Sequence, residues 1–325
     1  MMERIVTEVR NIQSEEDMTT ARRRVLIGLA VLGVLVSVRA VFPQELPWES
    51  YRGWDVPYVP TPNEVVKEML RLAMIKPGDL LYDLGCGDGR IVIAAAKTYG
   101  IQAIGVDIDP VRISESEANA AEASVTGKVK FINKDLFETD FSDASVVTMY
   151  LLTSVNLRLR PKLLADLRPG TRLVSHRFEM GEWRPDKSTS VPLNGGEQRW
   201  VYYWVVPANV TGRWEWNLDT GNGRRLYTFT ADQLFQVLGG TVSVEDREFA
   251  LSDGRLEGVL VHFRLDEERG GRRTGWLYEG EVQGNSIRGT ARPAEDPKAK
   301  PIPWTASRNP LTIKPLDAAS TDRRP

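Results

Sequence analysis

The chain has 325 residues, of which 42% are hydrophobic and 26% charged, and its formal net charge is −2 at pH 7. This length allows two domains with sizeable cores, and a charge so close to neutral gives no reason to expect a nucleic-acid partner. A single cysteine, Cys86, excludes an internal disulfide, and with only two histidines the chain lacks the ligands of a usual structural zinc site. We therefore expect no metal centre.

The first 60 residues divide into three segments of different composition. Residues 1–24 are a polar leader ending in three arginines, 25–42 are a hydrophobic segment, and 43–60 are a linker rich in proline and tryptophan. The hydrophobic segment has 14 uncharged residues before Arg39, fewer than the about 20 that span a bilayer. A short membrane anchor, a signal peptide and a buried core helix stay open as interpretations. We favour the anchor, because the leader is long for a signal peptide.

A helix is predicted directly after the linker. Thr61 is expected as its N-cap, Pro62 at its first position and Glu64 in a capping box. Strands and helices then alternate at the spacing of a doubly wound parallel sheet. The expected strands are 80–84, 103–106, 129–132, 146–152 and 172–175, with helices after Gly89, over 110–123 and over 157–167. The run 200–206 is expected to close the same sheet, so residues 61–207 predict an α/β, Rossmann-like domain.

The pattern changes at residue 208. Short alternating strands are expected at 214–218, 226–230, 242–244, 256–265, 276–282 and 286–290, separated by glycine-rich turns. The longest segment with a helical pattern is 231–238. Residues 208–291 therefore predict a C-terminal antiparallel β domain, either a small barrel or a sandwich. The remaining tail, 292–325, is expected to be largely disordered, with Trp304 as its one anchor.

The chemistry concentrates in the glycine-rich turn after the first expected strand. Residues 83–90 read Asp-Leu-Gly-Cys-Gly-Asp-Gly-Arg, so that Gly85, Gly87 and Gly89 leave the turn almost without side chains. A ligand can then reach the free N–H groups at the start of the following helix. The dinucleotide fingerprint requires a glycine where Arg90 stands, and Asp83 would repel a diphosphate. The turn therefore predicts a cationic ligand, and S-adenosylmethionine, with its ammonium and sulfonium groups, fits.

Acidic residues also follow the next two expected strands. Asp107 ends the second strand, where its carboxylate can accept from both hydroxyls of a ribose. Asp135 follows the third strand, where it can accept from an adenine amino group. Asp109 is better explained as the N-cap of the helix that begins at Pro110. Acids at three consecutive strand ends support S-adenosylmethionine as the cofactor.

These motifs resemble those of a known family. Residues 83–90, 105–109 and 133–137 look like the cofactor motifs of class I, seven-β-strand, S-adenosylmethionine-dependent methyltransferases. The wider set 57–62, 83–92, 134–137, 150–152 and 174–178 with Trp183 resembles the small membrane-associated protein-lysine methyltransferases of mitochondria and their bacterial relatives. The resemblance covers about residues 25–207 and implies a hydrophobic segment before the catalytic domain. The β domain lies outside it, which leaves the substrate open.

Two residues after the later strands are candidates for catalysis. Tyr150 stands where related enzymes present a segment that orients the nucleophile, although a buried strand aromatic is an equal interpretation. His176 ends the fifth strand and is either a base or a structural histidine. Tyr58 and Thr61 are expected to close over the methionine end of the cofactor. The full set of expected cofactor-binding residues is Tyr58, Thr61, Asp83, Gly85, Cys86, Gly87, Gly89, Asp107 and Asp135.

The sequence thus predicts an S-adenosylmethionine-dependent methyltransferase, and the resemblance favours a protein lysine as acceptor. A membrane protein is one candidate for this protein substrate. Methylation of a small molecule, and a non-catalytic cofactor-binding module whose β domain binds a partner, stay open as alternatives. The arginines at 22–24 would place the rest of the chain outside the membrane. The cofactor is made in the cytosol, so we expect a membrane-associated enzyme with a cytoplasmic catalytic domain, with export as the alternative.

Overall fold

The computed structural model describes residues 58–219, 223–269 and 271–316. The predicted leader, the hydrophobic segment 25–42 and most of the linker lie outside the described residues. Within these residues, no helix has both the length and the apolar composition needed to cross a membrane.

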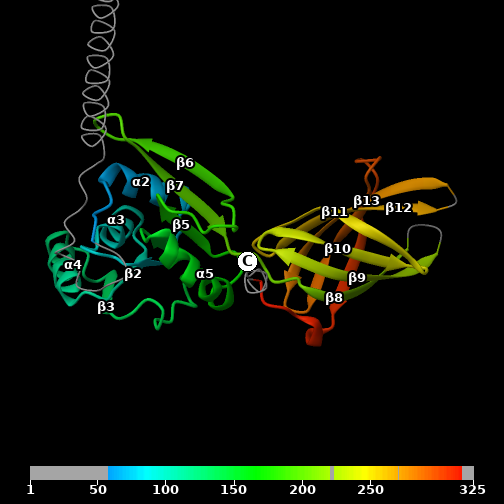
Figure 1. Ribbon diagram of the computed structural model, residues 1–325, viewed down its shortest axis with the longest axis horizontal. Helices are drawn as coiled ribbons and strands as arrows, with labels where there is room; N and C mark the ends of the chain where they lie inside the picture. Colours follow the sequence, from blue (N-terminus) through cyan, green and yellow to red (C-terminus); the bar gives the residue numbers. More distant parts are fainter. Residues whose placement is uncertain (1–57, 220–222, 270, 317–325) are drawn as a thin grey trace, which may run out of the picture. The chain divides into compact units, whose positions relative to one another are not determined.

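Seven strands form one mixed sheet in the order β3-β2-β1-β4-β5-β7-β6 (Figure 1). Strands β1 to β5 run parallel, whereas β7 is antiparallel to β5 and β6 is antiparallel to β7. Their bounds are β1 Leu80–Leu84, β2 Gln102–Asp107, β3 Val129–Asn133, β4 Val146–Met149, β5 Arg172–His176, β6 Lys187–Pro192 and β7 Gln198–Val205. The predicted α/β sheet is confirmed, including its closing strand. β6 was not predicted, because its residues are mostly polar.

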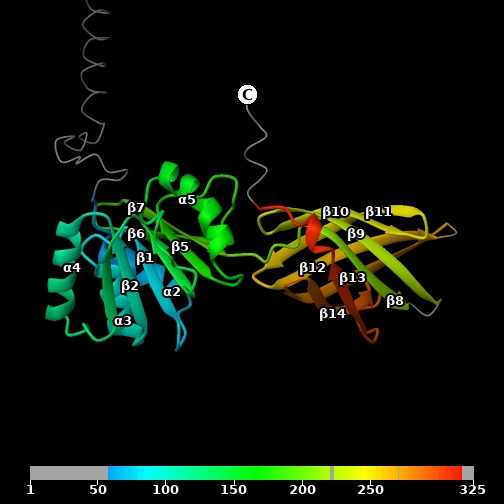
Figure 2. The ribbon, with the colours of Figure 1, turned by 90° about the horizontal axis from the view of Figure 1, so that it is seen from below.

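Helices cover both faces of this sheet. α2 (Asn63–Leu72), α3 (Arg90–Tyr99) and α4 (Pro110–Glu122) lie side by side, and α5 (Thr153–Asp166) lies on the opposite face (Figure 2). All residues of β4 and β5 are buried, as expected of central parallel strands covered on both sides. The carboxyl ends of β1 to β5 therefore meet at one edge that carries the connecting loops.

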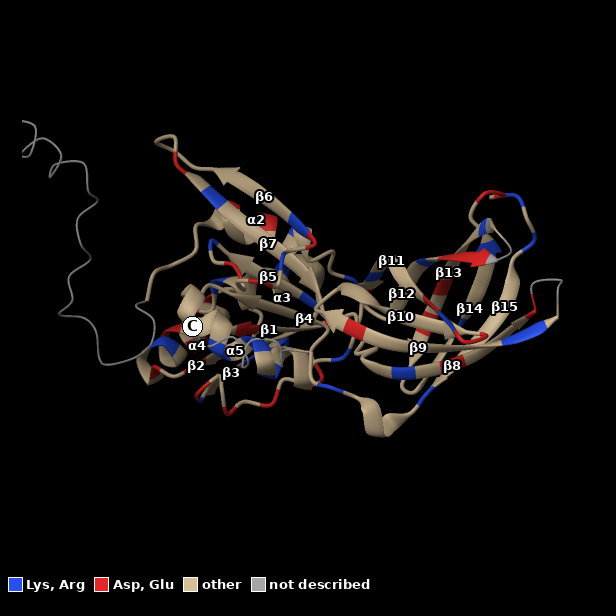
Figure 3. Cartoon of the chain, turned by 45° about the vertical axis from the view of Figure 1, so that its right-hand side comes forward, with Lys and Arg blue, Asp and Glu red and all other residues tan. Residues whose placement is uncertain are grey.

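Eight further strands form a closed antiparallel barrel, each paired with its neighbours in the chain and β15 paired with β8. Their bounds are β8 Gly212–Asp219, β9 Arg224–Leu234, β10 Val237–Val244, β11 Arg247–Glu257, β12 Leu260–Arg269, β13 Arg272–Gln283, β14 Ser286–Pro293 and β15 Ile302–Arg308, followed by the 3-10 helix η2 Pro310–Thr312. Buried and exposed residues alternate strictly along β8, so one side of the strand faces the core. Aromatic rings fill that core, with the Phe263 and Tyr278 centroids 4.7 Å apart. Figure 3 shows basic and acidic residues interspersed over both the sheet and the barrel.

Three sequence expectations for the β domain were wrong in detail. The run 256–265 is not one strand: Gly258, with φ +59°, turns the chain between β11 and β12. The segment 231–238 is not helical and instead forms the β9–β10 hairpin. The tail from 292 contains β15, which pairs with β14 and β8 and buries Trp304. β15 was not predicted because the tail contains many prolines and charged residues, although the buried positions of the strand are apolar.

Candidate active site

The glycine-rich turn leaves the sheet at the carboxyl end of β1 and enters α3. The N–H groups of Gly85 and Cys86 both donate to the Val106 carbonyl on β2, at 2.8 and 3.0 Å. Gly89 is the N-cap of α3 in a left-handed conformation and caps the helix with no side chain. The turn is therefore fixed to the sheet by its main chain, and these two N–H groups are used within the protein and are not free for a ligand.

Gly87 brings the turn against Tyr58. Its φ is +54°, and a Cβ atom at this position would lie 2.5 Å from Cε2 of the Tyr58 ring. The ring also lies under the Arg112 guanidinium, at 4.5 Å from its centroid. Tyr58 is 45% exposed, so it covers the turn from the solvent side. The position requires glycine both for its backbone angle and for this close approach.

Asp88 and Arg90 form an ion pair within the turn. Arg90 Nη2 lies 2.5 Å from Asp88 Oδ2, and Arg90 Nη1 donates to the Thr61 carbonyl at 2.8 Å. Burial alone would raise the pKa of Asp88, but the Arg90 guanidinium lowers it below its usual range. Arg90 thus compensates the Asp88 charge, which leaves Asp83 and Asp107 as the acids near the turn whose pKa values are raised.

Asp83 is buried in the sheet directly before the turn. It is 2% exposed, and Thr148 on β4 donates a hydrogen bond to its Oδ1 at 2.7 Å. Burial, with a smaller contribution from the charge of Asp107, raises the pKa of Asp83 to about 7, although the Thr148 hydrogen bond acts to lower it. This carboxyl therefore titrates in the neutral range, and it forms no ion pair with any of the described side chains.

Asp107 ends β2 and holds the turn through its carboxylate. Its Oδ2 accepts from Gly87 N at 2.8 Å and its Oδ1 accepts from Asp109 N at 2.9 Å. Burial raises the pKa of Asp107 above its usual range. Each oxygen keeps one more lone pair for a ligand hydroxyl. The expected helix cap is confirmed, because Asp109 is the N-cap of α4 and accepts from Val111 N at 2.8 Å.

Asp135 and Cys86, the last two residues expected to bind the cofactor, lie in different surroundings. Asp135 follows β3 in a loop, where its Oδ1 accepts from Phe137 N at 2.8 Å. The Cys86 side chain is buried and lies 2.8 Å from the position of a Cβ on Gly105. Burial raises the pKa of this thiol. The Cys86 side chain is thus enclosed in the protein, and its main-chain N–H is bonded to Val106.

Three aromatic rings gather after β4 and β5. The centroids of the Tyr150 and His176 rings are 3.9 Å apart, and those of Tyr150 and Phe178 are 5.9 Å apart in a stacked arrangement. Tyr150 directly follows β4, and His176 is the last residue of β5. The structure thus brings the two candidate catalytic residues into contact and adds Phe178 to them.

Thr61 connects this aromatic cluster, formed by Tyr150, His176 and Phe178, to the glycine turn. Its Oγ1 lies 3.2 Å from His176 Nδ1, while its carbonyl accepts from Arg90. The predicted role of Thr61 as helix cap was wrong: the N-cap of α2 is Pro62, and no side chain caps the helix. The hydroxyl is directed into the site instead, where it satisfies a buried imidazole nitrogen.

His176 is neutral at physiological pH. It is fully buried, and this burial lowers its pKa to about 4, with smaller contributions from Arg199 and Arg177. Its Nε2 atom is buried and has no hydrogen-bond partner among the described residues. The hydrogen-bonding capacity of this ring nitrogen is therefore unused among the described residues.

The loop after β5 is held by polar side chains that the sequence analysis missed. Ser175 Oγ donates to the Phe178 carbonyl at 2.7 Å, Asn156 Nδ2 donates to the same oxygen at 3.3 Å, and Arg160 Nη1 donates to the Met180 carbonyl at 2.9 Å. Ser175 and Asn156 are fully buried. The available signal was a serine within a buried strand and an asparagine on the inner face of a helix. Both are polar residues where apolar ones are the rule.

Comparison with known proteins gives this site a family. Residues 83–187 match the family model described as the ANTKMT methyltransferase domain. A protein-lysine N-methyltransferase of Saccharolobus islandicus is 49% identical over 152 residues, which cover 46% of this chain and 94% of that enzyme. The chain belongs to this methyltransferase family. It is an S-adenosylmethionine-dependent enzyme, as predicted, and the matched family segment ends before the barrel begins.

Further relatives are similar over about the same share of the chain. The adenine nucleotide translocase lysine N-methyltransferase of Mus musculus is 35% identical over 148 residues, which cover 46% of this chain and 63% of that enzyme. An RNA methyltransferase of Salinibacter ruber, solved with S-adenosyl-L-homocysteine, is 51% identical and covers 47% of this chain and 96% of that one, with a TM-score of 0.44.

The residues at the glycine turn fit S-adenosylmethionine. Burial raises the pKa values of two carboxyls, those of buried Asp83 and half-buried Asp107, above the usual range, because it disfavours their negative charge. A ligand with an ammonium and a sulfonium supplies the positive charge that favours their ionised form. The turn is bare at Gly87, where a side chain would fill the space next to Tyr58. Charge and shape therefore both suit this cofactor.

Proposed function

We propose that this methyltransferase methylates the side-chain amine of lysine residues in proteins. The observation that carries the proposal is the 49% identity to a protein-lysine N-methyltransferase over 94% of that enzyme's length. The aromatic cluster supports it, because electron-rich rings beside a buried, neutral imidazole suit a long apolar side chain that ends in an amine.

In this proposal, the turn and the acids after β2 and β3 hold the cofactor. Asp107 accepts from the ribose hydroxyls and Asp135 from the adenine amino group, while the glycine turn provides main-chain contacts. Tyr58 covers Gly87 from outside. When bound, the cofactor supplies an electrophilic methyl group on a sulfonium. Asp83, from its position before the turn, favours the positive charge of that ligand.

The acceptor lysine is assigned to the aromatic cluster. If Nδ1 of His176 carries the proton and donates to Thr61, the buried Nε2 is the free acceptor and can receive an N–H from the lysine amine. Because the pKa of His176 is about 4, its imidazole is too weak a base to keep the proton that the lysine ammonium must lose. In this proposal His176 therefore orients the amine, and the proton passes to solvent. Tyr150 and Phe178 are assigned to the lysine side chain. Their rings attract the lysine ammonium before it loses its proton, which brings the amine into the site.

We also propose that segment 25–42 associates the enzyme with a membrane and that the catalytic domain is cytoplasmic. The support is the composition of the segment and the cytosolic origin of the cofactor. Protease added to intact cells tests this directly. A barrel that stays intact until the cells are opened agrees with the proposal, and a barrel cleaved from outside contradicts it.

The acceptor is tested by incubating the full chain with methyl-labelled S-adenosylmethionine and a membrane lysate. A labelled protein band is expected, and Asp107→Ala should abolish it. Phe178→Leu should weaken labelling without preventing cofactor binding, because the cofactor contacts are assigned elsewhere. Exposed Trp200 provides a matched aromatic control, and Trp200→Leu should label normally. Label found only in small molecules or in RNA would contradict the proposed acceptor.

A further inference from the structure

Strands β11 and β12 separate at one end of the barrel. They are paired from Glu257 and Leu260 up to Leu251 and Leu265, and the pairing stops there. Residues 247–250 remain paired with β10, and residues 266–269 remain paired with β13. Four residues on each strand thus face a gap, here called the seam, in which their main-chain groups have no strand partner among the described residues.

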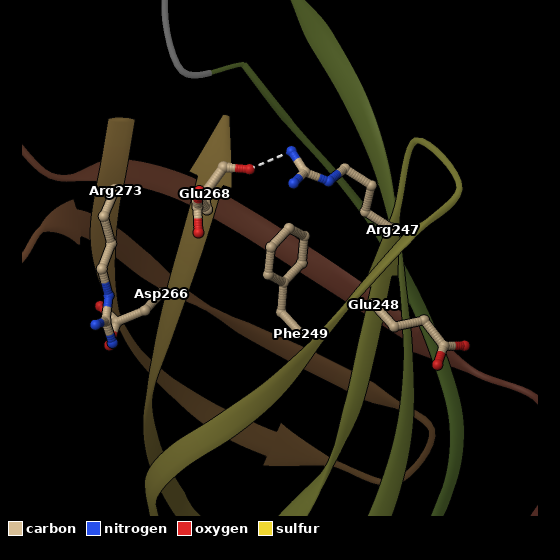
Figure 4. Close-up of a pocket in the computed structure, with 6 residues that line it drawn as sticks. All are labelled: Arg247, Glu248, Phe249, Asp266, Glu268 and Arg273. Carbon is tan, nitrogen blue, oxygen red and sulfur yellow. Dashed lines mark hydrogen bonds and ion pairs between the residues drawn. The ribbon is translucent and has the colours of Figure 1, made fainter. Parts of the chain in front are cut away.

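A cavity of about 530 Å³ lies at the seam. Figure 4 shows the Phe249 ring in the gap between β11 and β12, with charged side chains around it. Phe249 is half-buried and packs against the core of the barrel. The residues lining the cavity are Arg247, Glu248, Phe249, Asp266, Glu268 and Arg273.

A side chain substitutes for the missing strand partner. The Arg247 guanidinium donates to the main-chain oxygen of Glu268, as the dashed line in Figure 4 marks. Unpaired backbone groups at a strand edge accept a further strand readily. Arg247 is exposed and has a long side chain, so an incoming main chain can displace it from this oxygen.

Among the residues that line the cavity, the charge left free is negative. Arg273 is paired with Asp266 at 3.0 Å, and the Arg247 guanidinium donates to a carbonyl. The carboxylates of Glu248 and Glu268 form no ion pair with any described side chain, and Glu248 Oε1 accepts from the Ser243 hydroxyl at 3.5 Å. Two carboxylates beside a half-buried ring suit a segment that combines cationic and apolar side chains.

We propose that the seam binds an extended basic peptide segment by β-strand addition. The four unpaired residues on each strand span about 13 Å, at about 3.3 Å per residue, so about four residues of the peptide pair with them. Lysine or arginine side chains on one face of the peptide meet Glu248 and Glu268, while the other face contacts Phe249. This site is separate from the proposed transfer of methyl groups and does not depend on it.

The test measures fluorescence polarisation of a labelled octapeptide of alternating lysine and valine with the full chain. Saturable binding is expected, and the double variant Glu248→Gln with Glu268→Gln should weaken it by about tenfold, which is about threefold for each lost charge pair. Arg247→Ala should bind more tightly, because the Glu268 oxygen is then free. Glu281→Gln, an exposed change on β13, is the matched control and should leave binding unchanged.

Two further measurements separate strand addition from simple charge attraction. An octapeptide of alternating lysine and proline keeps its charge but loses half of its N–H groups, and it should not bind. Hydrogen exchange at the amides of residues 247–250 should slow when the lysine–valine peptide is added. The proposal is overturned if the lysine–valine peptide does not bind, if the proline peptide binds equally well, or if the double variant binds as the native chain does.

Discussion

Asp83 and His176 are buried at the same edge of the sheet, and burial shifts their pKa values in opposite directions. The pKa of Asp83 rises to about 7, whereas that of His176 falls to about 4, because burial disfavours the charged form of each group. Asp83 thus changes charge near neutral pH, and His176 does not. Of these two groups, only the Asp83 carboxyl can therefore make cofactor affinity depend on pH between about 6 and 8.

The affinity for S-adenosylmethionine is expected to rise with pH through about 7. Ionised Asp83 attracts the cationic cofactor, and its ionised fraction grows about tenfold between pH 6 and pH 8, so the dissociation constant should fall by about the same factor. Titration calorimetry at several pH values measures this. Asp83→Asn should bind weakly with little dependence on pH, and an unchanged pH profile in that variant would rule out the assignment to Asp83.

The pKa of Asp83 also has a consequence for stability. The native carboxyl keeps its proton up to about pH 7, while the unfolded one loses it near pH 4. Between these values the native state binds more protons, so the ligand-free protein should lose stability as pH rises from about 4 to about 7 at this site. Denaturant unfolding of the native chain and of Asp83→Asn at both ends of this range gives the difference.

Thr61→Val is expected to impair the site while the fold persists. Valine keeps the shape of the side chain but leaves His176 Nδ1 buried without a partner, which costs about 1–3 kcal/mol of unfolding free energy. Turnover should fall, since the imidazole is no longer held. Thr61→Ser retains the hydroxyl and should restore both properties; if it behaved like the valine variant, the hydrogen bond would not be the cause.

Residues at the carboxyl ends of apolar strands were the easiest to predict from the sequence. Asp83 lies one residue before the end of β1, Asp107 ends β2, and Asp109 follows two residues later as the N-cap of α4, so the strand pattern located all three. Thr61 was misassigned because its local pattern is that of a helix cap. The contact that its hydroxyl makes, with His176, lies 115 residues away in the chain.

At the scale of elements, the glycine turn and α3 form one unit, which we propose holds the cofactor. Gly87→Ala is expected to raise the dissociation constant for S-adenosylmethionine by at least about tenfold, about 1.4 kcal/mol, because the new Cβ would displace the Tyr58 ring. Calorimetry with the purified variant measures this.

Gly78→Ala is the control for the turn. Gly78 has an equally left-handed φ of +86°, but a Cβ there meets nothing within 4 Å. Its effect should be limited to a loss of about 1–2 kcal/mol of stability from backbone strain, with normal cofactor affinity. Equal loss of affinity in both variants would mean that strain, and not the approach of Tyr58, explains the result at Gly87.

The elements of the α/β domain could be predicted because their apolar periodicity is strong and their turns carry glycine and proline. β6 could not, since its sequence Lys-Ser-Thr-Ser-Val-Pro is stabilised as a strand by pairing with β7. In the β domain, the alternation of apolar and polar residues predicted that strands are present, but it did not predict where one strand ends and the next begins. The hairpin turn at Gly258 interrupts an apolar run that has the pattern of one strand.

At the scale of the whole molecule, β15 closes the barrel and Trp304 fills its core. The centroid of the Trp304 ring lies 5.2 Å from that of Tyr278 and 5.5 Å from that of Trp216, and the residue is 4% exposed. Trp304→Ala is expected to destabilise the protein by about 3–5 kcal/mol, measured by denaturant unfolding. Trp200→Ala, at a site 47% exposed, should change stability by less than about 1 kcal/mol. A small effect at Trp304 would contradict its role in closure.

The proposal that this enzyme methylates protein lysines is tested most directly by locating the transferred methyl group. The full chain is incubated with deuterated-methyl S-adenosylmethionine and a membrane lysate, and the labelled proteins are digested and sequenced by mass spectrometry. We predict the heavy methyl on the Nζ atom of lysine residues, and its absence when Asp107→Ala replaces the native enzyme. A heavy methyl on another side chain, or only in molecules that are not protein, would contradict the account.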